Sequence, residues 1–446
     1  MTAAAAPRSP RLLAATVGAL GARVLLLGLS LGQGVLLTRG LGPEGLGRYS
    51  AVLIDINLLV ALLSFGLPGA LAVLVGESAG SASRLTQLRA LGRQHGLALL
   101  ALLAVGACAT ALGLSLPGRT SAWSLLIALG ILIQYSRDVQ NSLLWGAQRF
   151  AVQNRLSLLV QLVLASALLV QVLLGRLSPM QAVALQLTAN LLWTLGALLW
   201  PRPDAIPAPD PSAPVASELS SLRRTAWRIG LRNYLSQLLD LLLLRIDVYL
   251  IQHLTPAATM ERDLGIYQAA VRVAELLLMV PSTLNAVLFA KAAAREDVAL
   301  MALRSAKLAL WIGLFGLAAM ALIGQPLLVL FFGSRFAGSF APCLWVLGGC
   351  VAWCFSGPLA GTLQGAAGYP RSVMLAQATA LFSNVLANLY LLPRYGVVGA
   401  AAATTLAYLV SAAFISLAFV RRFDLSLGQL LRPESPWTLW RALRNS

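Results

Sequence analysis

The stretch LRNYLSQLLDLLLLRIDVYLIQHL (Leu231–Leu254) decides the fold, because it is long and apolar enough to cross a membrane yet carries charges. A membrane-spanning helix needs about 20 mainly apolar residues. Arg232, Asp240, Arg245 and Asp247 interrupt this one, and each charge in hydrocarbon costs roughly 2.5–3.5 kcal/mol on an insertion scale. Such charges persist where they face a partner, a water-filled cavity or a polar cargo. The stretch is therefore our first candidate for a functional site.

The overall composition indicates a multi-pass membrane protein. The 446-residue chain is 58% hydrophobic and only 11% charged, whereas soluble domains average about 25% charged residues. A net charge of +17 would suggest nucleic acid as a partner of a soluble protein, but basic cytoplasmic loops explain it here. We therefore expect no nucleic-acid partner. The apolar runs are long and continuous, which favours helices over a β-barrel.

Cysteines and histidines provide no metal site. Cys350 and Cys354 would share a helix face, but no histidine or further cysteine completes a set of ligands. The two histidines, His95 and His253, are expected in loops. We expect no metal, no bound cofactor, no catalytic residue and no enzyme activity.

Apolar length and turn signals predict about twelve membrane-spanning helices. They cover residues 12–37, 50–75, 97–116, 122–144, 156–175, 180–200, 228–251, 264–290, 306–332, 341–366, 372–392 and 396–420. With both termini cytoplasmic, 22 lysines and arginines fall in inside segments, 7 in outside loops and four within spans. This bias fixes the predicted topology through the positive-inside rule.

A proline-rich segment divides the chain after the sixth span. Residues 201–214 contain six prolines in 14 residues, which is typical of an extended, solvated connector. The prediction is an N-terminal six-helix lobe over residues 1–200, a cytoplasmic linker over 201–227, a C-terminal six-helix lobe over 228–420 and a cytoplasmic tail over 421–446.

The two halves repeat short motifs at a nearly constant offset. Gly47–Tyr49 matches Gly265–Tyr267 at an offset of 218 residues, and Trp145–Ala147 matches Gln364–Ala366 at 219. An even number of spans in each half makes this a parallel repeat. The two lobes should then be related by a pseudo-two-fold axis along the membrane normal.

Glycines in the first span and after it have local explanations. Gly28 and Gly32 have the Gly-xxx-Gly spacing that lets helices approach closely. Gly42, Gly45 and Gly47 predict a tight turn on the outer side.

Several motifs resemble those of polysaccharide and O-antigen flippases. They are TRGLGPEGLGRYS (Thr38–Ser50), LGIYQAA (Leu264–Ala270), LFFG (Leu330–Gly333), Gln364–Gly365 and LPRYGVVGAA (Leu392–Ala401). In order and spacing the chain is similar to the polysaccharide-transporter branch of the multidrug/oligosaccharidyl-lipid/polysaccharide exporter superfamily. The resemblance implies a MATE-like all-α fold in the cytoplasmic (inner) membrane of a bacterium.

Charges within the predicted spans select four helices. They lie in spans one, two, seven and eight, and we assign none to spans three to six or nine to twelve. In the families that this sequence resembles, the same four helices line the central cavity between the lobes. The expected substrate-binding residues are Arg23, Asp55, Asn57, Asp240, Arg245, Arg272 and Glu275.

Helix geometry restricts how these charges meet. At about 100° per residue, Asp240 and Asp247 share a face, whereas Arg245 lies nearly opposite Asp247. Arg245 must therefore meet another helix, unless one of these charges reaches the outer surface. Arg272 and Glu275 are three residues apart and could pair within span eight. Purely structural ion pairing remains an alternative for each charge.

The resemblance implies a flippase that moves an undecaprenyl-diphosphate-linked oligosaccharide by alternating access, for cell-surface polysaccharide synthesis. The arginines of the set would neutralise the diphosphate, since guanidinium groups bind phosphate in a bidentate manner. The carboxylates would pair with the arginines or carry a coupling H+ or Na+. The implied partners are the lipid-linked glycan, membrane lipids, and a polysaccharide polymerase with glycosyltransferases.

Two alternatives stay open. A drug/cation antiporter of the same superfamily would favour acids over arginines in its cavity. A membrane glycosyltransferase or polymerase would need long outer loops or a soluble domain, whereas the predicted outer loops here are mostly under about 15 residues.

Overall fold

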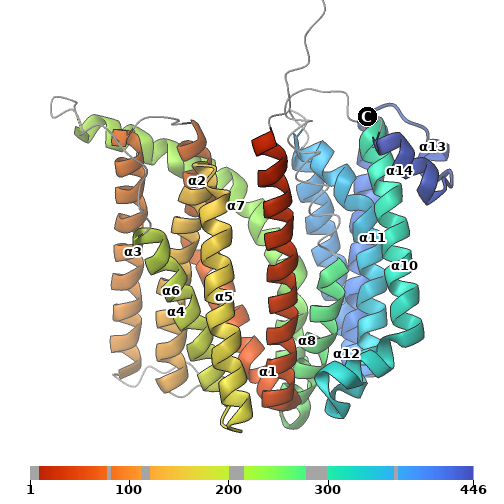
Figure 1. Ribbon diagram of the computed structural model, residues 1–446, viewed down its shortest axis with the longest axis horizontal. Helices are drawn as coiled ribbons and strands as arrows, with labels where there is room; N and C mark the ends of the chain where they lie inside the picture. Colours follow the sequence, from red (N-terminus) through yellow and green to blue (C-terminus); the bar gives the residue numbers. More distant parts are fainter. Residues whose placement is uncertain are drawn as a thin grey trace, which may run out of the picture. The chain divides into compact units, whose positions relative to one another are not determined.

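The computed structural model describes residues 10–77, 82–111, 121–199, 215–277, 299–365 and 370–444, without the side chains of residues 10–24, of some segment ends and of a few interior residues such as Arg232 and Asn233. All regular elements in these ranges are helices (Figure 1), which confirms the all-α fold. They are α1 (Pro10–Ser64), α2 (Leu67–Glu77), α3 (Ala82–Ala111), α4 (Ser121–Gly146), α5 (Phe150–Leu173), α6 (Pro179–Leu199), α7 (Val215–Leu254), α8 (Ala257–Leu277), α10 (Ala299–Phe332), the 3-10 helix η1 (Ser334–Ser339), α11 (Phe340–Gly365), α12 (Pro370–Arg422), α13 (Leu427–Leu431) and α14 (Pro436–Arg444).

Two helices are long enough for more than one crossing. Among the described residues, six apolar segments could span a membrane, and two of them, Leu25–Ser64 and Arg371–Arg422, are 40 and 52 residues long. At about 1.5 Å per residue, each exceeds the ~30 Å hydrocarbon core. Each bends at a glycine with positive φ: Gly42 in α1 (66°) and Gly396 in α12 (57°). The bend in α12 separates the two predicted spans 372–392 and 396–420.

The predicted span 50–75 is interrupted, because α1 ends at Ser64 and α2 begins at Leu67. Phe65 and Gly66 between them have positive φ values of 47° and 71°. The end of α1 leaves carbonyl oxygens without helical partners, and two side chains cover them. Tyr234 donates to the Leu62 oxygen at 3.1 Å, and a His95 ring nitrogen lies 2.9 Å from the Leu63 oxygen. The prediction that the histidines lie in loops is wrong: His95 is in α3 and His253 is in α7.

The first compact unit comprises Met1–Gly40 and Val52–Gln237. Its central helix, α4, contacts α2, α3, α5 and α6. The buried Tyr135 of α4 donates a hydrogen bond to the Gly92 oxygen of α3 at 3.2 Å. A Cβ atom at Gly92 would lie 3.0 Å from Val139, so the glycine allows the two helices to approach closely.

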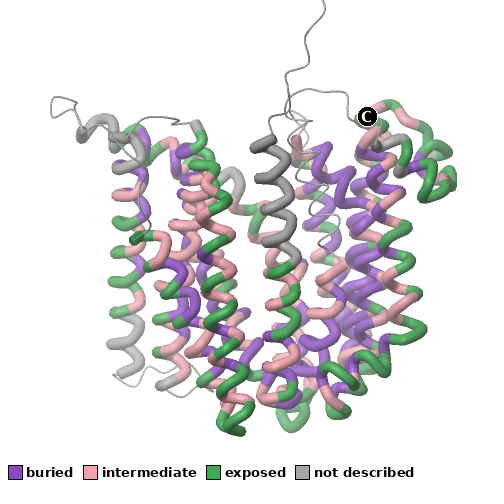
Figure 2. Tube along the Cα trace, in the orientation of Figure 1, coloured by how far each residue is buried: buried purple, intermediate pink, exposed green. Residues whose placement is uncertain are grey.

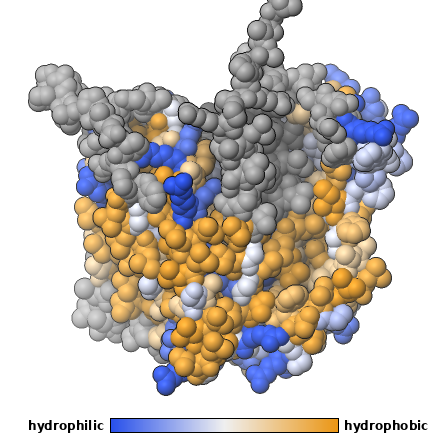
Figure 3. Space-filling model, viewed as in Figure 1, coloured by the Kyte–Doolittle hydropathy of each residue, from blue (hydrophilic) through white to orange (hydrophobic). Residues whose placement is uncertain are grey.

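The second compact unit comprises Leu41–Ala51 and Leu238–Ser446. Its central helix, α11, packs against α8, α10 and α12 and is buried along most of its length (Figure 2). On its outer side, α10 exposes apolar side chains such as Phe315 (78% exposed) and Leu322 (83%). Figure 3 shows that the described side chains around the middle of the helices are mainly apolar, as lipid contact requires.

The boundaries of these units depart from the sequence-based division of the chain. The helix α7 begins at Val215, inside the segment assigned to the linker, and continues from the first unit into the second. Residues 201–214 lie outside the described residues. The segment assigned to the tail contains α13 and α14.

Two copies of the repeated motif contact each other in the second unit. A Cβ atom at Gly47 would lie 1.9 Å from the Glu261 oxygen, and one at Gly265 would lie 1.9 Å from the Pro43 oxygen. Next to Gly47, Arg48 Nε forms an ion pair with Glu261 Oε2 at 2.6 Å. These glycines therefore permit a direct backbone contact between the segment Leu41–Ala51 and α8.

The close approach that the sequence suggested for Gly28 and Gly32 is not present. Within the described part of the chain, a Cβ atom at either position would meet nothing within 4 Å. Among the described residues of the first unit, the Gly-xxx-Gly spacing therefore marks no close helix contact.

We expect Gly47→Ala and Gly265→Ala each to destabilise the protein by about 1–3 kcal/mol, the usual cost of overpacking. The added methyl group would force two backbone segments apart, because the clashing atom is a carbonyl oxygen in both cases. The measurement is the midpoint of thermal unfolding in detergent. Gly32→Ala is the matched control and should leave the midpoint unchanged or slightly higher. An unchanged midpoint for Gly47→Ala would contradict the packing.

Candidate functional site

A buried carboxylate, Asp247 of α7, lies at the centre of the polar side chains in the second unit. Only 2% of Asp247 is exposed. Its Oδ2 atom accepts hydrogen bonds from the Tyr267 hydroxyl at 2.8 Å and from the Thr404 hydroxyl at 2.7 Å. Its Oδ1 atom accepts one from the Asn388 amide at 2.8 Å. Three helices, α7, α8 and α12, thus meet at one carboxylate through neutral donors.

Two asparagines extend this cluster along α12. The Asn388 Nδ2 atom also donates to Asn384 Oδ1 at 2.8 Å, and both residues are fully buried. In the described part of the chain, Asn384 Nδ2 and Asn388 Oδ1 are buried without a hydrogen-bond partner. Amide orientation is assigned from such networks. If the Asn388 amide were turned, its oxygen would meet the Asn384 and Asp247 oxygens, an arrangement that suits a hard cation.

An ion pair connects α7 and α8 beside this cluster. Arg245 Nη1 lies 2.9 Å from Glu275 Oε1, and the two side chains remain 28% and 33% exposed. The expectation that Arg245 meets another helix is therefore confirmed. The suggested pair between Arg272 and Glu275 is wrong, because Glu275 pairs with Arg245. Arg272 instead lies over the Tyr49 ring, 5.8 Å from its centre.

The remaining residue of the set in this unit, Asp240, is also partnered. Its Oδ1 atom accepts a hydrogen bond from the amide of Gln377 in α12, and Gln377 is only 5% exposed. The structure thus places Asp240, Arg245, Arg272 and Glu275 on two helices of one unit, each with a neighbour that compensates its charge or polarity.

The other three residues of the set belong to α1 in the first unit. Asp55 is 8% exposed, whereas Asn57, two residues further, is exposed. Arg23 belongs to α1 by its backbone, but its side chain lies outside what the structure describes.

Sequence reasoning missed a second polar cluster, in the first unit. Arg137 of α4 donates to Asn190 Oδ1 at 3.0 Å and lies over the Trp193 ring, 5.6 Å from its centre. Its neighbour Asp138 accepts from the Gln134 amide at 3.0 Å. The statement that spans three to six carry no charge is therefore wrong. The signal was available, since both residues interrupt the apolar run 122–144.

The substrate-binding residues expected from the sequence also omitted Asp247, although this residue was among the charges noted in the stretch Leu231–Leu254. Asp247 lies near the end of the predicted span 228–251, but α7 continues to Leu254 and Asp247 is buried. The tyrosine of the second repeat motif, Tyr267, could have indicated a partner for this acid.

Comparison with known proteins agrees with this fold. The family model described as "Polysaccharide biosynthesis protein" matches residues 15–289. The lipid II flippase MurJ in an inward closed conformation is similar in structure, with a TM-score of 0.59, 12% identity, and coverage of 91% of this chain and 89% of that one. No curated protein matches in sequence.

Two further solved structures belong to the MOP superfamily. An inward-facing multidrug resistance MATE family transporter has a TM-score of 0.64 and 16% identity, with 89% of this chain and 94% of that one covered. A transporter from Pyrococcus furiosus has a TM-score of 0.59 and 17% identity, with 90% and 93% covered. Identities this low establish the fold alone, but the family match covers more than half of the chain. The protein therefore belongs to the polysaccharide biosynthesis protein family, and its fold is similar to that of these transporters.

Proposed function

We propose that this protein flips an undecaprenyl-diphosphate-linked oligosaccharide across the cytoplasmic membrane of a bacterium by alternating access, for the synthesis of cell-surface polysaccharide. The observation that carries the proposal is the partly exposed ion pair between Arg245 and Glu275, on helices of a transporter whose family is that of polysaccharide biosynthesis. The termini lie on the cytoplasmic side, where the lipid-linked glycan is built by glycosyltransferases and from which it passes toward a polymerase.

The physical problem is to move a diphosphate through hydrocarbon. Guanidinium groups can replace the water around phosphate oxygens, since they present several donors in a fixed plane. In the protein without cargo, the Glu275 carboxylate takes the place of the phosphate, with Oε1 2.9 Å from Arg245 Nη1. Because both side chains stay about one-third exposed, a phosphate oxygen can reach Arg245 without unfolding the helix pair. The diphosphate of the cargo would then replace Glu275 as the partner of the Arg245 guanidinium.

A second arginine can act in the same way. The Arg272 guanidinium lies over the aromatic ring of Tyr49, 5.8 Å from its centre. A cation held against an aromatic face keeps its charge available to an anion. Arg245 and Arg272 together offer two positive charges to a diphosphate.

The Asp247 cluster provides the coupling site of the proposal. A fully buried carboxylate surrounded by neutral donors is costly to keep charged, so either a proton or a cation relieves it. The oxygens of Asp247, Asn384 and Thr404 suit Na+, and the carboxylate alone suits H+. A bound ion would supply only charge there, while Tyr267 and Asn388 hold the carboxylate in place.

Transport by a purified protein tests the proposal directly. The substrate is a fluorescent undecaprenyl-diphosphate-linked oligosaccharide in proteoliposomes, and the readout is its loss from the outer leaflet. Arg245→Ala should slow transport about 10- to 100-fold, since a hydrogen bond to a charged group is worth about 1.5–3 kcal/mol. Arg394→Ala is the matched control, because Arg394 is exposed and bonds only locally to the Tyr390 oxygen.

A charge exchange separates cargo binding from ion pairing. The double variant Arg245→Glu with Glu275→Arg keeps the ion pair. Its unfolding midpoint should match that of the unchanged protein, but its transport rate should stay well below that of the unchanged protein. Full recovery of transport would assign the pair a structural role only. Transport of an organic cation in place of the glycan would favour the drug/cation antiporter.

We expect Asp247→Asn to fold and to lose the dependence of transport on an ion gradient. The amide has nearly the same shape as the carboxylate, but it binds neither a proton nor a cation with comparable strength. The measurement is the transport rate with and without an imposed H+ or Na+ gradient. Asp263→Asn, on the same helix as Tyr267, is the control. Gradient dependence that persists in Asp247→Asn would place the coupling site elsewhere.

We expect Arg23→Ala to abolish transport while leaving the protein inserted. A neutral residue near mid-span inserts more easily by roughly 2.5–3.5 kcal/mol, so a loss of activity would report a lost interaction. Arg23→Lys should retain part of the activity, because it keeps the charge without the bidentate geometry. The measurement is accumulation of lipid-linked glycan in cells that carry each variant. Normal export by Arg23→Ala would remove Arg23 from the mechanism.

A further inference from the structure

An open apolar groove lies along α10, α11 and α12 in the second unit. Its volume is about 630 Å³, which is within the range of sites that bury a small molecule. The side chains that form its wall are apolar, among them Leu314, Phe355, Leu409 and Leu417. Since these helices span the membrane, hydrocarbon chains suit a groove with such apolar walls better than water does.

One end of this groove is charged and held in a fixed shape. Lys307 of α10 bonds to Glu434 Oε1 at 2.6 Å and to the Gln429 oxygen at 2.9 Å. The Trp311 indole donates to the Glu434 main-chain oxygen at 2.9 Å. A capping box at Ser426 and Gln429 fixes the start of α13. The chain from α13 to Glu434 therefore forms a strap, pinned to α10, across this end of the groove.

Among the charged residues that line the groove, Lys307, Arg432 and Glu434, the net charge is +1. Lys307 and Glu434 neutralise each other, while Arg432, which also lines the groove, is exposed. An occupant with an apolar body and a single negative charge at one end would complement this arrangement. A phosphodiester has one negative charge, whereas a diphosphate has at least two.

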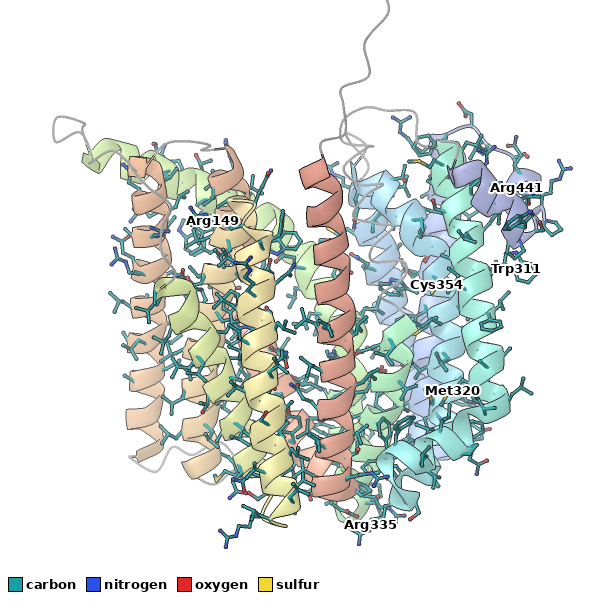
Figure 4. The ribbon with its side chains drawn as sticks, viewed as in Figure 1. Arg149, Trp311, Met320, Arg335, Cys354 and Arg441 are labelled. Atoms are coloured by element: carbon teal, nitrogen blue, oxygen red, sulfur yellow. The ribbon has the colours of Figure 1, made fainter. Side chains whose placement is uncertain are left out.

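The helix that follows the strap is suited to a membrane surface. In α14, Leu439 is fully buried against the unit while Trp437 is 58% exposed. The Arg441 guanidinium lies over the Trp437 ring, 4.8 Å from its centre. Tryptophan and arginine together are typical of the interface between lipid tails and headgroups. Figure 4 shows Trp311 of α10 and Arg441 of α14 at the same edge of this unit, so the charged end of the groove lies near headgroup level.

We propose that this groove is a binding site for one anionic glycerophospholipid, with its acyl chains along α10, α11 and α12 and its phosphate on Arg432. The site is separate from the proposed cargo residues of α7 and α8, so its test does not depend on the proposed function.

Native mass spectrometry of the delipidated full-length protein tests the proposal, with phosphatidylglycerol and phosphatidylcholine as probes. We expect one phosphatidylglycerol to remain bound, more tightly than phosphatidylcholine. Arg432→Gln should weaken phosphatidylglycerol about five- to tenfold and remove the preference, since one arginine near anionic lipid is worth about 1 kcal/mol. Arg421→Gln is the matched control, because Arg421 is exposed at the end of α12 and does not line the groove.

A second variant fills the groove without touching its charges. Ala413 is exposed and lines the groove, so Ala413→Phe should abolish binding of both lipids while the unfolding midpoint in detergent stays the same. Ala321→Phe, at an exposed position of α10 outside the groove, should change neither quantity. Unchanged lipid binding in Ala413→Phe would overturn the proposal. So would displacement of phosphatidylglycerol by equimolar undecaprenyl phosphate, or a dimer that Ala413→Phe converts to a monomer.

Discussion

The absence of water from hydrocarbon is the constraint on which this structure depends. A polar group inside a membrane-spanning lobe must find its partner within the protein. Asp247 shows the result most fully, because three neutral side chains from α8 and α12 donate hydrogen bonds to one carboxylate of α7. The acid thereby fixes the relative positions of three helices, since moving any one of them would strand a buried hydrogen-bonding group.

The first unit meets the same constraint with amide and hydroxyl side chains grouped near Arg137. Asn190 of α6 accepts from Arg137 and donates to Gln134, and Trp193 donates to Ser157 of α5. Further out, Gln33 of α1 pairs with Gln161 of α5 at 2.6 Å. The two units therefore use different chemistry for cohesion: amides around an arginine in the first, hydroxyls and amides around a carboxylate in the second.

Much of the fold could be predicted from the sequence, because apolar length is a strong signal. The predicted span 156–175 begins six residues after α5 does and ends two residues after it, and 341–366 differs from α11 by one residue at each end. The break at Phe65 and Gly66 could not be predicted, since its stabilising contacts come from Tyr234 and His95, which are distant in sequence. Charges were easy to find but their partners were not: Glu275 pairs across helices with Arg245 and not with its sequence neighbour Arg272. Partner choice depends on helix rotation, which the sequence does not state.

The membership of Leu41–Ala51 in the second unit has a consequence for how the halves of this protein can be separated. A cut in the proline-rich segment 201–214 would divide the chain between the two repeats, yet the C-terminal fragment would lack the backbone that Gly265 contacts. It would also lack Arg48, the partner of Glu261. The C-terminal half is therefore an incomplete folding unit, and a short piece of the first repeat acts as its missing side. The boundary between the repeats in the sequence is therefore not the boundary between the two compact units.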